Sequence, residues 1–98
     1  MLRHIVLISW IEGTTPEQVA TVAAALDALP PVIDAIRSYT HGPDLGLGSP
    51  RYDYAIVADF DDAAGWQFYD RHELHEKARA EVIVPIVAQR ASVQFELR

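Results

Sequence analysis

Alternating apolar and polar residues predict four strands along the chain. Residues Leu2 to Trp10 are rich in Ile, Val and Leu and are followed by a Gly turn, a pattern typical of a strand buried on both faces. A shorter segment, Ile36 to Gly42, is a candidate second strand before a loop rich in Gly and Pro. Residues Tyr52 to Phe60 alternate most clearly. The last strand is predicted over Ala91 to Leu97, where apolar and polar residues again alternate.

The first helix has clear start and stop signals. Thr15 is a good N-cap, and Pro16 occupies the first helical position, where proline is tolerated. Gln18 stands three residues after the cap, as in a capping box. Apolar residues then recur at steps of three and four until Pro30 ends the helix, so the helix has one apolar face.

The second helical region covers residues 65–87, after a predicted N-cap at Asp61-Asp62. Its helical spacing is interrupted near His72 and again at Pro85. The elements therefore run strand, helix, strand, strand, helix, strand. This order predicts an α+β chain, a ferredoxin-like βαββαβ subunit with a four-stranded antiparallel sheet.

A sheet with helices on one side leaves its other face bare. Apolar residues on both faces of several predicted strands indicate that something covers this face. A second copy of the chain would do so and form a homodimeric α/β barrel, and a chain of 98 residues would gain from the extra burial. The alternative is a monomer with a polar open face, which the large apolar residues Tyr54, Ile56 and Phe60 on one face of the third strand disfavour.

Composition narrows the set of partners. The chain has single-domain length, and no linker divides residues 1–98. Its formal net charge of −6 argues against nucleic acid and anionic membrane surfaces, which attract clustered Lys and Arg. No stretch reaches the roughly 20 apolar residues that span a bilayer. The absence of cysteine excludes disulfides, thiolate nucleophiles and cysteine-ligated metals, and it fits a cytoplasmic protein.

Several segments together resemble one protein family. They are Arg3 to Trp10, the Leu29-Pro30 helix end, Tyr52 to Val57, and Tyr69 to His75 followed by Pro85. In this order they resemble the stress-responsive α/β-barrel, or Dabb, domain. The resemblance implies a ferredoxin-like subunit over residues 1–98 and a homodimeric barrel. The chain is also similar to plant polyketide cyclases of the olivetolic acid cyclase type, which carry out an aldol cyclisation in this scaffold without a cofactor.

Three side chains in the first half of the second helical region suit such a reaction. Imidazole titrates near neutral pH and can take a proton from a carbon next to a carbonyl, which makes His72 and His75 candidate general bases. A tyrosine such as Tyr69 can donate to the oxygen on which enolate charge develops. The resemblance implies that Tyr69 and His75 are the catalytic pair and that His4 lines their pocket.

Two positions depart from the cyclase pattern. Tyr54 stands where the cyclases have another pocket histidine, and Glu73 replaces a proline between the two histidines. The first change could alter which substrate is positioned, and the second could alter where His75 points. The candidate substrate-binding residues are His4, Tyr54 and Trp10, although Trp10 also suits a packing position.

Each of these residues also has a purely structural interpretation. A histidine near a helix start often caps backbone groups, and Tyr69 and Tyr54 could be core aromatics. His72 and His75 are too few for a metal site, which normally has three or four ligands, so no metal or cofactor is expected. His41 is expected in a solvated loop.

Three functions remain open. The first is a cofactor-independent cyclase or lyase-type enzyme that acts on a small polyketide-like or aromatic substrate. The second is a non-catalytic, stress-associated binding or assembly module, with or without a small-molecule ligand. The third is a cofactor-free monooxygenase of the same fold, in which a substrate carbanion reacts with oxygen. An enzyme requires Tyr69 and His75 to converge on an enclosed space, whereas an assembly module does not.

Overall fold

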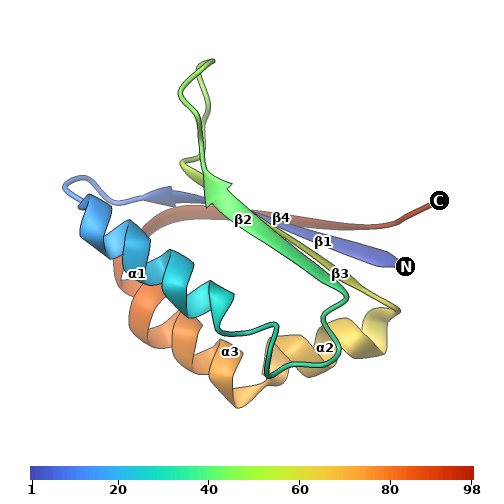
Figure 1. Ribbon diagram of the computed structural model, residues 1–98. Helices are drawn as coiled ribbons and strands as arrows, with labels where there is room; N and C mark the ends of the chain where they lie inside the picture. Colours follow the sequence, from blue (N-terminus) through green and yellow to red (C-terminus); the bar gives the residue numbers. More distant parts are fainter.

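Four strands form one antiparallel sheet in the computed structural model, which describes residues 1–98. The strands are β1 (Leu2–Trp10), β2 (Ser38–Pro43), β3 (Tyr54–Phe60) and β4 (Val87–Glu96), in the spatial order β2-β3-β1-β4. The helices are α1 (Pro16–Asp27), α2 (Ala63–Arg71) and α3 (Glu73–Ala78), and they lie on one side of the sheet (Figure 1). This arrangement confirms the predicted ferredoxin-like βαββαβ subunit.

The helix ends follow the capping signals in the sequence. The Thr15 hydroxyl accepts a hydrogen bond from the Gln18 backbone N–H, and the Gln18 side chain accepts one from the Thr15 backbone, so the capping box is present. The Asp62 carboxylate caps α2 by accepting from the Gly65 N–H at 2.9 Å. His72 has extended backbone angles and separates α2 from α3, as the sequence predicts. No helix here combines the length and apolar character of a bilayer span.

A π-helical turn, Arg79–Ile83, and a 3₁₀ turn, Val84–Ile86, connect α3 to β4. The last strand begins at Val87 rather than at the predicted Ala91, because β4 pairs with β1 along almost its whole length, down to Trp10. Polar residues in this stretch interrupt the alternation, so the sequence pattern does not predict where the strand begins. The second and third strands also begin two residues later than predicted, at Ser38 and Tyr54.

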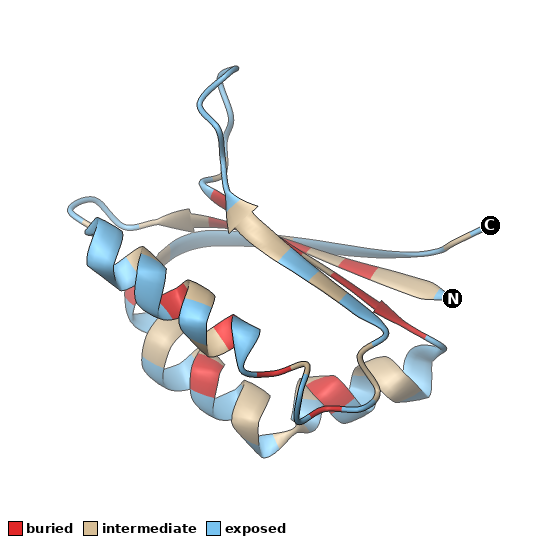
Figure 2. Cartoon of the chain, in the orientation of Figure 1, coloured by how far each residue is buried: buried red, intermediate tan, exposed pale blue.

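The core lies between the sheet and the helices (Figure 2). Alternate residues of β1 and β3, such as Ile8, Ile56 and Phe60, point to the helical side and share one buried cluster with Val22 and Leu26 of α1 and Tyr69 of α2. The Tyr54, Ile56 and Phe60 face is therefore the covered face of the sheet, and the prediction that it marks the open face was wrong. In a single copy of the chain, only one face of β1 is buried and not both faces, because the chain's own helices cover only that side of the sheet.

The open face of the sheet is nonetheless apolar. It carries the alternate residues Ile5, Leu7, Val57, Val93 and Phe95, which the strand register places side by side. Val93 is 56% exposed and Phe95 is 45% exposed. Large apolar side chains gathered on one exposed face are typical of an interaction surface.

An ion pair flanks this apolar surface. Arg3 donates two hydrogen bonds to the Asp59 carboxylate, at 2.8 and 2.9 Å, and Ser38 donates a third at 2.8 Å. The hydrogen bond from Arg3 holds the pKa of Asp59 below its usual value. The carboxylate is therefore ionised and satisfied although Asp59 is buried.

Candidate active site

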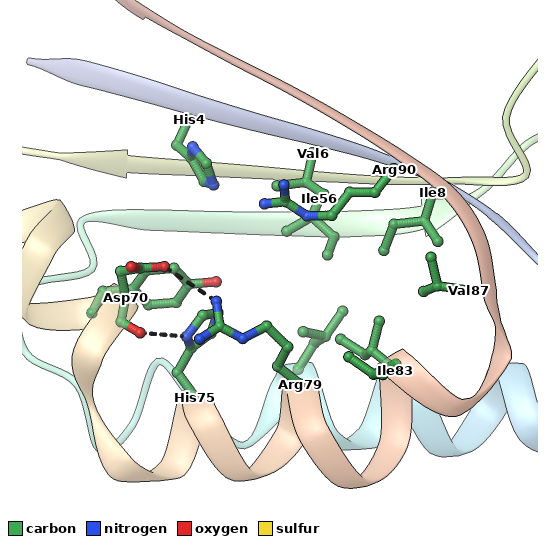
Figure 3. A pocket seen from close by; sticks show the side chains of 13 residues that line it. His4, Val6, Ile8, Ile56, Asp70, His75, Arg79, Ile83, Val87 and Arg90 are labelled. Carbon is green, nitrogen blue, oxygen red and sulfur yellow. Dashed lines mark hydrogen bonds and ion pairs between the residues drawn. The ribbon is translucent and has the colours of Figure 1, made fainter.

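A cavity of about 240 Å³ lies between the sheet and the helices (Figure 3). Its walls are mostly apolar, and a cluster of titratable side chains lies at one end. The lining residues are His4, Val6, Ile8, Leu26, Ile56, Tyr69, Asp70, His75, Arg79, Ile83, Val84, Val87 and Arg90. The fold thus brings together three of the residues singled out from the sequence, namely His4, Tyr69 and His75.

His75 reaches the cavity from α3, and its ring orientation is fixed by the backbone. Its Nδ1 lies 3.0 Å from the carbonyl oxygen of Asp70. Because a carbonyl oxygen can only accept, Nδ1 carries the proton of the neutral ring, and Nε2 keeps its lone pair. Burial lowers the pKa of His75, so the ring is neutral at pH 7. His75 therefore presents a basic nitrogen.

Tyr69 packs against this imidazole from α2. The two ring centroids are 4.3 Å apart, and Tyr69 is buried. Its hydroxyl lies 2.9 Å from the hydroxyl of Tyr39 on β2. Burial raises the pKa of both phenols. Either hydroxyl can donate in this bond, and when Tyr39 donates, the Tyr69 O–H is free to donate to another group.

His4 faces the same space from β1. The amide nitrogen of Gln94 on β4 lies 2.9 Å from its Nδ1. An amide nitrogen only donates, so Nδ1 accepts and the proton of the neutral ring is on Nε2. Burial lowers the pKa of His4 and keeps the ring neutral. His4 and His75 thus have opposite tautomers, one presenting an N–H donor and the other a lone pair.

Charged residues surround the polar end of the cavity. Arg79 lies 3.5 Å from the Asp70 carboxylate and also pairs with Glu76. Arg90 extends from β4 on the sheet side, opposite Arg79 (Figure 3). A polar groove that shares His4, Asp70 and both arginines continues outward from this end. The cavity therefore has an apolar interior and a charged opening.

The comparisons with known proteins identify the family. The sequence pattern of the family described as the Stress Responsive A/B Barrel Domain, or Dabb, matches residues 2–97. The chain belongs to the Dabb family. No curated protein matches it.

Solved structures agree with this assignment. A dimeric ferredoxin-like protein of unknown function from Thermobifida fusca is 44% identical, with 98% of this chain and 90% of that chain covered and a TM-score of 0.90. A dimeric protein of unknown function from Bacteroides fragilis is 26% identical, with 98% and 95% covered and a TM-score of 0.84. The hydroxynitrile lyase from Passiflora edulis is 16% identical, with 99% and 93% covered and a TM-score of 0.86, and this likeness concerns the fold alone.

The remaining predicted residues of this Dabb domain lie outside the cavity. The Nδ1 of His72 accepts a hydrogen bond from the Leu74 N–H at 3.1 Å and caps α3, so His72 and His75 do not converge. No cluster of three or more potential metal-ligating side chains is present. Trp10 packs against the core, with its ring 5.7 Å from that of Tyr54. Neither Trp10 nor Tyr54 lines the cavity.

The prediction that His41 lies in a solvated loop was wrong. His41 belongs to β2, and its side chain is only 8% exposed. Its Nε2 lies 2.7 Å from the Asp27 carboxylate, and its Nδ1 lies 2.6 Å from the Tyr54 hydroxyl. Since the Asp27 carboxylate can only accept, the Nε2 of His41 donates to it, and in the neutral ring Nδ1 then accepts from the Tyr54 hydroxyl. The Tyr54 hydroxyl is occupied by this chain of hydrogen bonds.

Sequence reasoning missed several residues that line the cavity or hydrogen-bond to its lining residues. Arg79 stands four residues after His75, and this helical spacing could have placed both on one face. Arg90 and Gln94 share a face of β4, but their approach to His4 depends on the pairing of the two ends of the chain. Tyr39 also reaches Tyr69 only through the sheet pairing. No local signal identifies these three residues.

Proposed function

We propose that this Dabb chain is a cytoplasmic, homodimeric, cofactor-independent enzyme of the cyclase or lyase type, with His75 as its general base. The observation that carries the proposal is the state of the His75 ring. The Asp70 carbonyl holds its Nδ1, while its Nε2 has no hydrogen-bond partner within the chain and the ring lines the cavity. A general base needs this combination of a fixed ring and a free lone pair.

The proposed step starts with removal of a proton from a carbon next to a carbonyl group. The His75 Nε2 takes the proton, and the electron pair of the C–H bond moves to the carbonyl oxygen as an enolate. The Tyr69 O–H and the His4 Nε2–H are donors on the same cavity, and they stabilise the developing negative charge. The enolate carbon then attacks a second carbonyl of the substrate, and protonated His75 returns its proton to the alkoxide. The reverse sequence cleaves a carbon–carbon bond, as in a lyase.

The size and lining of the cavity suggest a small substrate. A cavity of about 150 Å³ is enough for benzene. The space of about 240 Å³ therefore admits one substituted ring or a short polyketide-like chain. Val6, Ile8, Ile56 and Ile83 supply the apolar walls that such a body requires.

The proposed homodimer forms through the open face of the sheet. The apolar surface of Ile5, Leu7, Val57, Val93 and Phe95 described above, on which Val93 and Phe95 are the most exposed, would be covered by the same surface of a second copy. The dimeric proteins from Thermobifida fusca and Bacteroides fragilis support this assembly, since they share the fold at 44% and 26% identity. The absence of cysteine supports the cytoplasmic location.

A turnover assay with matched histidine variants tests the enzymatic proposal. The substrate is sought by screening small β-polyketo thioesters and aromatic carbonyl compounds. We expect His75→Asn to lower turnover by about 10²–10⁴-fold, the usual effect of a positioned general base. His72→Asn is the control, since Asn is also a good N-cap and His72 lies outside the cavity, so it should retain turnover. Equal losses in both variants, or ligand binding without turnover in any of them, would contradict an enzymatic role for His75.

A further inference from the structure

We infer that the substrate of the proposed reaction carries a carboxylate, which the Arg90 guanidinium binds at the opening of the cavity. This inference rests on the proposed function, because it takes the same cavity as the substrate site. Arg90 lines both the apolar cavity and the polar groove that continues from it, so its side chain lies at their junction.

Arg90 has no partner within the chain. None of its nitrogen atoms takes part in an ion pair or a side-chain hydrogen bond. By contrast, Arg3, Arg37 and Arg79 each pair with a carboxylate. Arg90 therefore offers a guanidinium whose planar set of donors remains free to bind both oxygens of a ligand carboxylate.

The local charge also favours an anion. Asp70 is the only acidic residue that lines the cavity or the groove, whereas Arg79 and Arg90 line both. Arg79 pairs with both Asp70 and Glu76, so these three residues carry no net positive charge. Arg90 is therefore the cation of the opening that no carboxylate of the chain offsets. Its free guanidinium would attract a small anion to the opening.

The position of Arg90 fixes the orientation of such a substrate. The apolar body would fill the space beside Val6 and Ile56, and the carboxylate would remain at the wet opening. Figure 3 shows Arg90 on the same side of the cavity as His4, facing His75 and Arg79 on the helical side. The carbon next to the substrate's carbonyl group would then lie between the two histidines. Ion pairing at Arg90 would thus position the reacting carbon.

Equilibrium binding of a matched pair of probes tests this inference without any turnover. The probes are 3-phenylpropionate and its neutral amide, 3-phenylpropionamide, titrated at pH 8 and followed by NMR chemical shifts. At this pH both cavity histidines are neutral because their pKa values are lowered, so they contribute no positive charge. We expect the wild-type protein to bind the acid about 10-fold more tightly than the amide, as one charge-assisted contact provides. Arg90→Gln should remove this preference.

Arg51→Gln is the matched control, since it removes the same charge from a loop residue that does not line the cavity. It should keep the preference for the acid. Arg90→Gln with an undiminished preference, a wild type that does not distinguish the probes, or no binding of either would overturn the carboxylate site. The turnover assay can fail separately. Equal losses in His75→Asn and His72→Asn, or ligand binding without turnover, would contradict the role of His75 as a base, and an Arg90-dependent preference for the acid would still support the carboxylate site.

Discussion

At the scale of single residues, the hydrogen-bond partner of each histidine determines what it can do. A backbone carbonyl at Nδ1 leaves the His75 Nε2 with a free lone pair, and an amide nitrogen at the same atom makes the His4 Nε2 an N–H donor. The sequence predicts the residue types and that Tyr69 and His75 share a site. It does not predict the tautomers, because Gln94 reaches His4 only through the pairing of the first and last strands.

The backbone at His72 explains why the spacing of His72 and His75 does not show which of them faces the cavity. The spacing of three residues would place His72 and His75 on one face of a continuous helix. The backbone of His72 is extended instead, with φ −63° and ψ 137°, so the helix ends there and a new one begins. His72 becomes a cap and His75 a cavity residue. The spacing alone shows that the two side chains are candidates but not which of them faces the cavity.

At the scale of elements, the sequence predicts best where local chemistry sets the boundary. β1 spans its predicted residues because its apolar run is continuous, and α1 begins at its predicted capping box. The boundary before β4 is harder to predict from the sequence, because Pro85 lies within a 3₁₀ turn. The exposed start of the strand is held by its pairing with β1. Long-range pairing rather than local propensity decides such a boundary.

A hydrogen bond between elements gives a stability prediction. Tyr54 on β3 donates to His41 on β2, which in turn contacts Asp27 at the end of α1. Tyr54→Phe removes the donor and leaves the His41 Nδ1 unpaired, so we expect the free energy of unfolding to fall by about 1–2 kcal/mol in urea denaturation. Tyr52→Phe is the control, because the Tyr52 hydroxyl makes no hydrogen bond within the chain and should have little effect. Equal stability of the two variants would show that the connection through His41 contributes nothing.

At the scale of the whole molecule, the two faces of the sheet differ in what covers them. The chain's own helices cover one face, and the other exposes apolar side chains. The sequence predicts that apolar residues occur on both faces, and hence that a partner is needed. It does not show which face of a given strand the helices cover, since Ile56 and Val57 are equally apolar neighbours. The three-dimensional structure makes that distinction.

Neighbouring residues on β3 therefore give a paired test of the homodimer. Val57 lies on the open face, and Val57→Asp should yield a folded monomer, because an unpaired charge in the interface costs several kcal/mol, on the order of the free energy of association. Ile56 is 5% exposed in the core, and Ile56→Asp should unfold the chain. Light scattering measures the mass, and circular dichroism measures the helix content. A wild-type monomer at micromolar concentration, or a Val57→Asp dimer, would contradict assembly through this face.

The central claim is that His75 takes a proton from carbon, and deuterium exchange measures that step directly. Acetophenone and related aryl ketones in D₂O, followed by proton NMR, report the loss of the proton next to the carbonyl. We expect the wild-type protein to accelerate exchange, with a rate that rises with pH through a midpoint below the ordinary histidine value, because burial lowers the pKa of His75 and only the neutral ring is a base. His75→Asn should exchange at the buffer rate at every pH. Exchange that is no faster than buffer with the wild type, or equal rates with both proteins, would contradict the claim.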